Sequence, residues 1–542
     1  MSFDPVAQWA ARTPSHLAVR QCHPADCAWT YAALHALVEG ASTWLRAYGV
    51  GRQDRVAVLA SNRVETLIVA FAAWRLGAIA VPLNWRLTPG ELARLLEHAA
   101  PRVLLMDADH EALARDALAR DALAHDALRH TREPMVATRL PSVYDFTATP
   151  AGQASISGVA EAEADADSDA AAYAHADADE VAMLLYTSGS TGQPKAVCVS
   201  HRQLRANAES TIAGWGMSSE DRVLVATPLF HTAGWHALTT PVLAAGGTVV
   251  LDGDFEAERF MGTMQAEAIT RTFVVPTQLL MAQRTSRWGT PLPALRQWLV
   301  GGAPCPRAAR DDAQATGYPV VEAYGLTECG PNCFVLDPQV TALPPGTVGH
   351  PLPGLEARVV DEAEAPVARG TVGALQFRGA MVCAGYWEDP TASRALMAHD
   401  GWMRTGDLAS VEADGRFRMA GRAKALFISG GEHVYPGEVE RALREVEAIE
   451  EVVVVAVPDP WWGEVGCAVV TRRAPLDVDV LMRHARLALA GYKRPRYLLE
   501  IATWPTLGSG KIDRARVAEL ARAALAGEDS SMMAISQDAG RE

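Results

Sequence analysis

Short apolar runs alternate with helical patterns along the first half of the chain. Residues 56–60 form an apolar run of strand length, and residues 64–76 have the length and composition of a helix. The alternation continues with strands predicted at 78–82, 103–106, 223–226, 248–251 and 272–275, and with a helix at 91–99. Strand–helix alternation of this kind predicts parallel sheets whose faces are covered by helices.

Two segments depart from this alternation. Residues 110–130 contain the near-repeat ARDAL ARDAL AHDAL, with leucines at 113, 118, 123 and 128. Five residues advance a helix by about 500°, so the leucines spread around the axis and we expect a solvated insertion, with an interaction surface as the alternative. Residues 151–180 are rich in Ala, Asp, Ser and Gly, which predicts a flexible acidic surface loop.

The composition indicates a folded protein with more than one domain. The 542 residues exceed what a single core usually supports, and 49% hydrophobic with 21% charged residues is typical of globular proteins. The net charge is −15, and eight acidic residues lie within 161–180. A nucleic-acid partner would need a basic face, so we expect none.

The start of the sequence and its apolar stretches predict neither export nor membrane insertion. The chain begins MSFDPVAQWA, without a basic start and apolar run, and its most apolar stretch, 67–83, is short for a bilayer and contains Arg75. The eight cysteines have no CxxC spacing and predict reduced thiols. We therefore expect a cytoplasmic protein without a membrane partner.

The string YTSGSTGQPK at 186–195 has the composition of a phosphate-binding loop. Glycines permit close approach of the backbone, hydroxyl and N–H groups donate to phosphate oxygens, and the lysine adds positive charge. The loop lacks the GxxxxGK[ST] pattern of a Walker A motif. The candidate nucleotide-binding residues in it are Thr187, Ser188, Gly189, Ser190, Thr191, Gly192 and Lys195.

This string resembles the phosphate loop of the adenylate-forming superfamily, which includes acyl-CoA synthetases, luciferases and peptide-synthetase adenylation domains. Further motifs of that family follow in order: YGLTE at 324–328, GWMRTGD at 401–407, GRAK at 421–424 and GK at 510–511. The resemblance extends from about residue 29 to 514 and is strongest to stand-alone acyl-CoA synthetases.

The resemblance implies an α/β fold in two domains. A large N-terminal domain, 1–423, would contain parallel sheets in αβα layers and a small β-barrel-like part. A small mobile α+β domain, 424–525, would follow, and 526–542 reads as a disordered tail. The implied reaction is ATP-dependent activation of a carboxylic acid to an acyl-adenylate with release of pyrophosphate, followed by acyl transfer to an acceptor.

Five residues of the large domain would bind the nucleotide and its metal. By the resemblance, Glu328 holds Mg²⁺, a hard cation suited to carboxylate and phosphate oxygens. Thr327 would contact the α-phosphate, and Tyr324 would stack on the adenine. Asp407 would accept hydrogen bonds from the ribose hydroxyls, with Arg422 reaching the ribose or phosphates.

Lys511 is the principal catalytic candidate, because it lies in PTLGSGKIDR, which matches the family's C-terminal lysine loop. Its ammonium would bridge the substrate carboxylate and the α-phosphate as charge develops there. Gly302, Ala303 and Pro304 would line the adenine and acyl slots. Lys424 occupies the hinge position about which the small domain swings after adenylation.

Coenzyme A is the favoured acceptor. The segment SGGEHVYP at 429–436 resembles a loop of acyl-CoA synthetases, in which Gly430 and Gly431 would let pantetheine pass close to the backbone. The alternatives are a carrier protein, an amine or nitrite as acceptor. A non-catalytic nucleotide-binding module is the alternative from another class, although the intact motifs oppose it.

The acid itself is indicated only in outline. PLFHTAGW at 228–235 resembles the acyl-pocket motif, with His231 as a catalytic or gating contact. Trp235 and the turn that begins at Gly325 would bound a short slot, which favours a short or aryl acid. A homodimer is an open alternative to a monomer.

Overall fold

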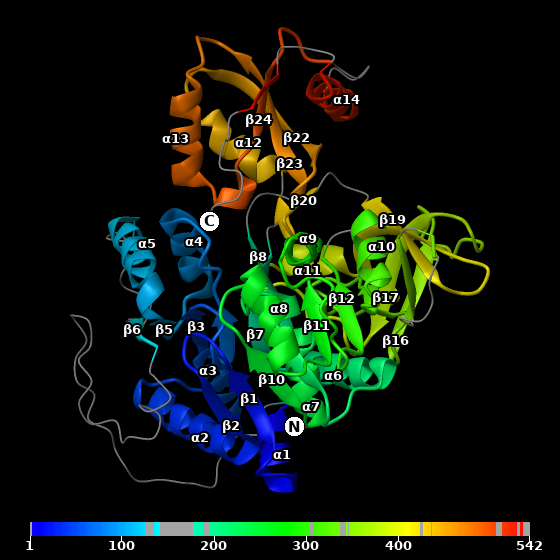
Figure 1. Ribbon diagram of the computed structural model, residues 1–542. Coiled ribbons are helices and arrows are strands. Elements are labelled where there is room, and N and C mark those ends of the chain that lie inside the picture. The colour runs from blue at the N-terminus through cyan, green and yellow to red at the C-terminus, as the bar shows by residue number, and fades with distance from the viewer. Residues whose placement is uncertain are drawn as a thin grey trace. The chain divides into compact units, whose positions relative to one another are not determined.

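The computed structural model describes residues 3–124, 135–140, 177–187, 194–302, 305, 307–336, 343–344, 346–422, 427–434, 436–505, 512–527 and 532–534 (Figure 1). The chain divides into two compact units. The larger comprises Met1–Trp85, Ala93–Tyr186 and Ala196–Gly421; the smaller comprises Arg86–Leu92, Thr187–Lys195 and Arg422–Glu542. The predicted domain boundary at 423/424 and the acidic loop up to residue 176 lie outside the described residues.

The larger unit contains two mainly parallel sheets. The first has the order β13-β12-β11-β9-β10-β1-β2, in which only the edge strand β2 pairs antiparallel. The second has the order β6-β5-β3-β4-β7-β8. Their strands are β1 (Leu17–Gln21), β2 (Cys27–Thr30), β3 (Arg55–Leu59), β4 (Ile79–Pro82), β5 (Val103–Met106), β6 (Val136–Arg139), β7 (Val181–Thr187), β8 (Lys195–Ser200), β9 (Arg222–Val225), β10 (Thr248–Leu251), β11 (Arg271–Val274), β12 (Gln297–Val300) and β13 (Val320–Glu322).

Helices cover these sheets, as the alternation predicts. They are α1 (Pro5–Arg12), α2 (Tyr31–Ala47), α3 (Val64–Arg75), α4 (Pro89–Ala99), α5 (Glu111–Ala124), α6 (His201–Trp215), α7 (Thr239–Ala245), α8 (Ala257–Ala266), α9 (Pro276–Gln283), α10 (Arg307–Ala315) and α11 (Pro390–Leu396), with the short turns η1 (Ala108–His110) and η3 (Ala233–Ala237). Helix α3 is buried on every side. Its charged end is matched, because Arg75 Nε donates to Asp4 Oδ2 at 2.7 Å.

A third sheet provides the small β part of the larger unit. Its order is β14-β15-β19-β18-β17-β16, and the pairs with a defined register are antiparallel. The strands are β14 (Phe334–Val335), β15 (Thr347–Pro351), β16 (Leu355–Val360), β17 (Gly373–Gly379), β18 (Met403–Val411) and β19 (Phe417–Arg422).

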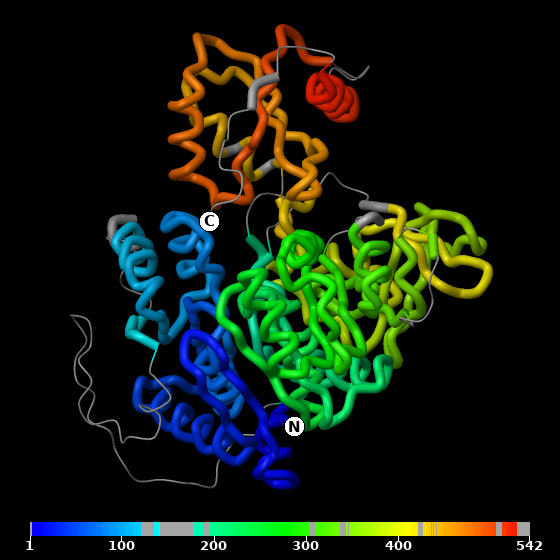
Figure 2. Tube along the Cα trace, viewed as in Figure 1, coloured from blue at the N-terminus to red at the C-terminus, as the bar shows by residue number. Residues whose placement is uncertain are grey.

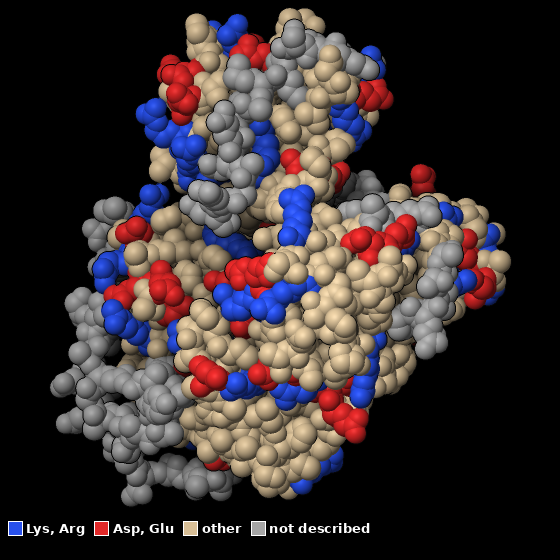
Figure 3. Space-filling model, viewed as in Figure 1, with Lys and Arg blue, Asp and Glu red and all other residues tan. Residues whose placement is uncertain are grey.

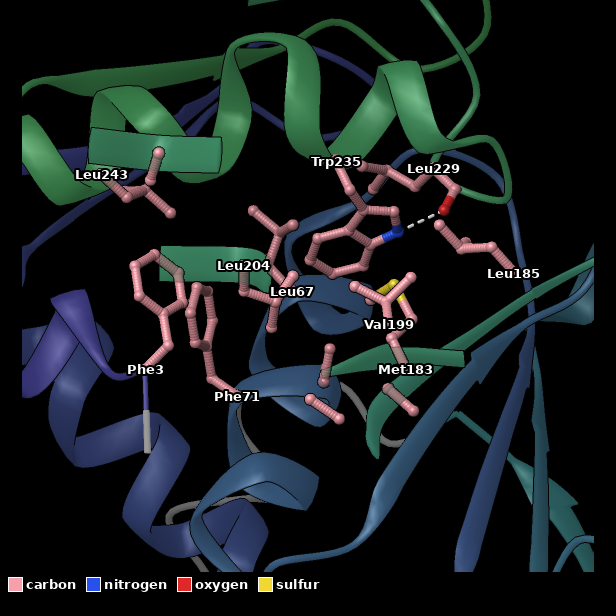
Figure 4. Packing of buried hydrophobic residues seen from close by; sticks show 14 of the residues in the cluster. Phe3, Leu67, Phe71, Met183, Leu185, Val199, Leu204, Leu229, Trp235 and Leu243 are labelled. Atoms are coloured by element: carbon pink, nitrogen blue, oxygen red, sulfur yellow. Dashed lines mark hydrogen bonds between the residues drawn. The ribbon is translucent and has the colours of Figure 1, made fainter. Parts of the chain in front are cut away.

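The core of the larger unit is built around two tryptophans. The rings of Trp74 and Trp235 lie 6.0 Å apart and are each at most 1% exposed. Figure 4 shows Trp235 among aliphatic side chains contributed by different elements, with Leu204 and Val199 beside it. Burial of such large rings makes a major hydrophobic contribution to stability.

The first part of the five-residue repeat, up to residue 120, is packed on one side, which differs from the expectation of a solvated insertion there. Helix α5 buries Ala114 and Ala117 completely and half-buries Leu113 and Leu118. At 100° per residue these four side chains fall within about 140° of one another. In this part of the repeat the two alanines lie between the two leucines on one face of the helix, which the leucine positions alone do not reveal.

The smaller unit is an α+β structure in which the two faces of one strand pack into two separate hydrophobic clusters. Strand β22 (Ile449–Asp459) turns Val452 and Val454 toward α12 (Pro436–Arg444) and α13 (Val478–Ala488), and turns Val453 and Val455 toward α14 (Arg514–Leu525). This is the two-residue period of a strand covered on both faces. In the Cα trace, α13 and α14 lie on opposite sides of the strands of this unit (Figure 2). The other elements are β20 (Phe427–Ser429), β21 (Glu432–Val434), β23 (Gly463–Arg472), η4 (Gly491–Lys493), β24 (Tyr497–Glu500) and β25 (Met532–Ala534).

The C-terminal end of the chain differs from the predicted disordered tail in one place. Strand β25 pairs antiparallel with β24, with Leu498 opposite Met533. Three uncharged residues are enough to add main-chain hydrogen bonds along an otherwise open strand edge.

No helix among the described residues is both long and apolar enough to cross a bilayer.

On the face in Figure 3, the described acidic side chains do not gather in one area but alternate with basic ones.

Candidate active site

The YGLTE motif forms a tight turn directly after strand β13 of the first parallel sheet. Leu326 N donates to Gly330 O at 3.0 Å, and Cys329 N donates to Leu326 O at 3.2 Å. Gly325 is required sterically, because a Cβ there would lie 2.2 Å from the backbone of Pro331. Turns that follow the carboxyl ends of parallel strands are the usual ligand-binding edge of such sheets.

Glu328 is held in place from three directions. Tyr386 Oη donates to Glu328 Oε1 at 2.7 Å. The backbone carbonyl of Glu328 accepts from Cys383 N at 2.7 Å and from Gln203 Nε2 at 3.5 Å. Among the described residues, the carboxylate is oriented by a neutral donor and pairs with no cation.

Tyr324 and Asp407 form a second fixed pair. Tyr324 Oη donates to Asp407 Oδ2 at 2.6 Å, and Asp407 is only 4% exposed on strand β18. The ring of Tyr324 also lies 5.8 Å from that of Phe334 and 6.4 Å from that of Phe377. The sequence predicted separate contacts of Tyr324 with adenine and Asp407 with ribose, and the structure joins the two residues directly.

The phosphate loop is described at its two ends. Thr187 closes β7, Lys195 opens β8, and Thr187 Oγ1 donates to Lys195 O at 3.4 Å. Strands β7 and β8 are neighbours in the second sheet. The segment that joins them lies outside the described residues.

Among the other predicted site residues, Gly302 and Arg422 are described and nine are not. Gly302 is exposed with φ of +84°, a conformation that favours glycine. Arg422 ends strand β19, and its side chain is not among those described. The remaining predicted residues outside the described ranges are Ser188, Gly189, Ser190, Thr191, Gly192, Ala303, Pro304, Lys424 and Lys511.

The two residues predicted from the acyl-pocket motif differ in their surroundings. His231 is half-buried, with its ring 4.6 Å from that of Phe230. Trp235 is fully buried, and its indole N–H donates to Leu229 O, a contact drawn in Figure 4. Its role as a wall of the acid slot stays a prediction, because its described neighbours belong to the core.

The glycines of the SGGEHVYP segment have a local reason in the smaller unit. Gly430 has φ of +58° and Gly431 has φ of +86°. Gly430 N donates to Trp462 O at 3.0 Å, and a Cβ on Gly430 would lie 2.4 Å from Trp462 Cε3. The close approach of the indole requires glycine at position 430, whatever else passes this loop.

The buried thiols near the Glu328 turn are expected to be unreactive, because burial raises their pKa values. Burial raises the pKa of Cys198 to about 12, and burial likewise raises the pKa values of Cys329 and Cys383 well above the ordinary range. All eight cysteines are free thiols. Protonated thiols are poor nucleophiles, so these residues act as small apolar side chains.

Sequence reasoning missed Tyr386 and Gln203. Tyr386 lies 58 residues from Glu328 in the sequence, and no spacing rule links the two. The usable signal was the string GYWED at 385–389, in which a tyrosine follows a glycine with φ of +123°. Gln203 could have been noticed as a polar residue on the buried face of α6.

Comparison with known proteins identifies the family. The model described as "AMP-binding enzyme" matches residues 6–387, and that described as "AMP-binding enzyme C-terminal domain" matches 438–511. A feruloyl-CoA synthase of Amycolatopsis sp is 36% identical over 511 residues, covering 94% of this chain and 96% of the relative. An indoleacetate–CoA ligase of Aromatoleum aromaticum is 35% identical over 494 residues, covering 91% and 93%.

Solved structures agree with this relationship. The o-succinylbenzoate CoA synthetase from Bacillus subtilis has a TM-score of 0.81 at 27% identity, covering 95% of this chain and 98% of that one. An amide bond synthetase from Marinactinospora thermotolerans also has a TM-score of 0.81, at 26% identity, with 96% and 99% covered.

The chain therefore belongs to the AMP-binding enzyme family. The predictions of an adenylate-forming ligase with an α/β fold and a small C-terminal domain are confirmed. The predicted enzyme class, an ATP-dependent acid–CoA ligase, agrees with the relatives and is likewise confirmed.

Proposed function

We propose that this enzyme activates an aromatic carboxylic acid with ATP in the cytoplasm and transfers the acyl group to coenzyme A. The observation that carries the proposal is the pair of fixed carboxylates: Glu328 held by Tyr386, and Asp407 held by Tyr324. The aromatic class is supported by the relatives named for feruloyl and indoleacetate substrates.

Three residues bind the nucleotide or stabilise developing charge in this proposal. Asp407, nearly buried and already bonded to Tyr324, accepts from the ribose hydroxyls and fixes the nucleoside. Thr327, in the adjoining turn, donates to the α-phosphate where charge develops. Lys511 supplies the mobile positive charge that lets two anions, the acid and ATP, approach each other.

The residues of the turn fit Mg²⁺. Glu328 offers a hard oxygen donor that is half-buried and oriented by a neutral hydroxyl group. Protein sites for Mg²⁺ commonly contribute one or two carboxylates and leave the remaining positions to substrate phosphates and water. When bound there, the ion would neutralise phosphate charge during departure of pyrophosphate.

The proposal is tested with the purified enzyme, ATP and a library of acids, with pyrophosphate release followed in the presence of coenzyme A. Thioester formation with an aromatic acid is the expected result. The acceptor is tested by replacing coenzyme A with an amine, nitrite or a carrier protein. Faster product formation with one of these would overturn the assignment of coenzyme A while leaving acid activation intact.

We expect Tyr386→Phe to weaken the binding of Mg²⁺ without disturbing the fold. The phenylalanine cannot donate to Glu328 Oε1, so the carboxylate loses its fixed orientation. A hydrogen bond to a charged group contributes about 1.5 kcal/mol or more, so the Mg²⁺ concentration for half-maximal pyrophosphate release should rise about tenfold.

The matched control for that variant is Tyr318→Phe. It removes a tyrosine hydroxyl that donates to Thr290 O at 2.7 Å in the same unit. The control should leave the Mg²⁺ titration unchanged. Identical titration curves for both variants and the unaltered enzyme would show that Tyr386 does not orient a metal ligand.

We expect Gly430→Ala to slow acyl transfer more than adenylation. The added Cβ would collide with Trp462 and would also strain a backbone at φ of +58°. Gly463→Ala is the matched control, because φ is +79° there and nothing lies within 4 Å of a Cβ. The control carries only the left-handed backbone strain of about 1–2 kcal/mol. Equal rates of thioester formation in the two variants would exclude a special role for Gly430.

A further inference from the structure

Five consecutive residues of the larger unit, 383–387, contact two parts of the candidate site. On one side they hold the turn that carries Glu328. Cys383 N donates to the main-chain oxygen of Glu328 at 2.7 Å, and Tyr386 Oη donates to the side-chain atom Oε1 of Glu328 at 2.7 Å. The segment therefore fixes both the main chain and the carboxylate of the proposed metal ligand.

On the other side the same segment pairs with strand β8. This strand begins at Lys195, the last residue of the predicted phosphate-binding string. Val197 of the strand lies opposite Tyr386 in an antiparallel bridge. The N–H groups of Trp387 and Cys198 donate across the pair, at 2.8 and 2.9 Å, on either side of this bridge. One segment thus connects the strand that leaves the phosphate-binding string with the residue proposed to bind Mg²⁺.

The main chain of Tyr386 is held on its other edge by helix α11. Because the bonds to β8 belong to its neighbours, the N–H and C=O groups of Tyr386 point away from that strand. Tyr386 N donates to Ser393 Oγ at 2.9 Å, and Tyr386 O accepts from Asp389 N at 3.3 Å. The tyrosine is thus fixed between β8 and the first turn of α11.

Ser393 can accept this bond because its own proton is used elsewhere. Its Oγ donates to Asp389 O at 2.7 Å, and its contact with Tyr386 O is longer, at 3.3 Å. The side chain of Asp389 in turn caps α11 by accepting from Ala392 N at 2.8 Å. The serine hydroxyl group therefore has a defined orientation, in which a lone pair faces the N–H of Tyr386.

A glycine allows α11 to approach the segment this closely. A Cβ on Gly385 would lie 2.7 Å from Ser393 Oγ and 2.9 Å from Ser393 Cβ, and φ at Gly385 is +123°. Both the contact and the backbone conformation require glycine. Two positions of the sequence, 385 and 393, are therefore adapted to the same contact with the main chain of Tyr386.

We propose that Ser393 is a positioning residue for the binding of Mg²⁺ and ATP. It holds the main chain of Tyr386, and through this tyrosine it places the Glu328 carboxylate and the beginning of β8. The inference rests on the proposed function, since it takes Glu328 as the metal ligand and 186–195 as the phosphate-binding string. Ser393 touches no reactant in this role. Its loss leaves the Tyr386 N–H without this acceptor, so the segment can shift against both of its partners.

The test uses the full-length enzyme, with pyrophosphate release measured against Mg²⁺, ATP and the acid in turn while the others are saturating. In Ser393→Ala we expect the Mg²⁺ concentration for half-maximal rate and the KM for ATP each to rise about fivefold, as for the loss of one hydrogen bond. The KM for the acid should stay the same, because neither Glu328 nor β8 binds the acid in the proposed function. Unchanged values for both Mg²⁺ and ATP would overturn the proposal.

A double variant shows whether Ser393 acts through the tyrosine. In Tyr386→Phe the hydroxyl group that holds Glu328 is already absent. Adding Ser393→Ala should therefore raise the Mg²⁺ concentration for half-maximal rate little further, while the KM for ATP still rises about fivefold. Fully additive effects on the Mg²⁺ titration would show that Ser393 acts by another route, and the proposal would be wrong.

Thr391→Ala is the matched control on α11. Thr391 is exposed, and its hydrogen bond among the described contacts is accepted from Arg394 Nη2 at 3.5 Å. The control should leave all three titrations unchanged, and equal shifts in the control and in Ser393→Ala would overturn the proposal. If Ser393→Ala does not fold, Ser393→Cys keeps a similar shape with a weaker acceptor. An unchanged Mg²⁺ titration in that variant would likewise overturn it.

Failure of this inference can be distinguished from failure of the proposed function. A Mg²⁺ titration that Tyr386→Phe leaves unchanged counts against Glu328 as the metal ligand, and so against both. A shift in Tyr386→Phe without any shift in Ser393→Ala contradicts only the role of Ser393.

Discussion

Lys511→Ala should abolish acyl-adenylate formation while preserving much of the transfer of a preformed acyl-adenylate to coenzyme A. The ammonium is predicted to contact the reacting carboxylate and α-phosphate only in the first half-reaction. Loss of a transition-state charge contact costs about 3 kcal/mol or more, which is roughly a 10²-fold loss of rate or greater.

The structure around the lysine loop explains why the fold should survive this change. Asp513 N donates to Pro505 O at 2.8 Å and so closes the base of the loop. Arg514 is bound by Glu440 through two hydrogen bonds of 2.8 and 2.7 Å. Pro505 precedes Lys511, Asp513 and Arg514 follow it, and neither contact involves the lysine side chain.

Two single-turnover measurements test the lysine assignment, one following pyrophosphate release and one following thioester formation from preformed acyl-adenylate. Arg516→Ala is the matched control, since it removes an exposed positive charge on α14 that pairs only with Glu519 among the described contacts. Near-normal pyrophosphate release by Lys511→Ala, or an equal loss in both half-reactions, would contradict the assignment.

The parallel sheets could be predicted closely from the sequence. Strands β3, β4 and β5 agree within one residue with the apolar runs at 56–60, 78–82 and 103–106. A central strand of such a sheet is buried on both faces, so its residues are apolar without interruption and end at polar turns. The strand–helix alternation then leaves few possible arrangements.

Features that depend on which way a side chain points could not be predicted. Trp235 lies on η3, a π-helical turn that shifts the phase of the side chains relative to an α-helix, so its burial and its bond to Leu229 O could not be inferred from the spacing of residues. In the first part of the repeat at 110–130 the packed face includes Ala114 and Ala117, which the positions of the leucines did not indicate. The pairing of Tyr386 with Glu328 spans 58 residues and has no periodic signal.

In the candidate site, too, some residues could be predicted from the sequence and others could not. Motifs of the family supplied Tyr324, Thr327, Glu328 and Asp407, because consecutive residues in a turn can be recognised as a string. The residues that orient Glu328, namely Tyr386 and Gln203, come from elements far from it in the chain. Their role follows from hydrogen-bond accounting in three dimensions and not from the order of residues.

Asp221→Ala should be among the most destabilising single changes in the larger unit. The Asp221 side chain is fully buried and accepts from Arg271 Nε at 3.1 Å, from Thr270 Oγ1 at 2.7 Å and from Ser218 N at 2.9 Å. Arg271 is itself only 6% exposed. Removing one partner of a buried ion pair leaves an uncompensated charge, which costs about 3–5 kcal/mol.

The remaining contacts of Arg271 cannot replace the carboxylate. Arg271 donates to Gln297 Oε1 at 2.6 Å and to Trp215 O at 2.9 Å, and both of these acceptors are neutral. Asp221→Asn keeps an acceptor but loses the charge, so its loss of stability should be intermediate. The graded series separates the electrostatic part of the effect from the loss of hydrogen bonds.

The measurement is chemical denaturation of each variant at neutral pH, with Glu356→Ala as the control. Glu356 pairs with Arg378 on the surface, where their side chains are 57% and 44% exposed, and exposed pairs contribute little because water screens them. We expect the control to keep the midpoint of the unaltered protein and Asp221→Ala to lower it clearly. Equal midpoints for Asp221→Ala and Glu356→Ala would mean that water solvates Arg271. The buried ion pair would then contribute no more to stability than an exposed pair.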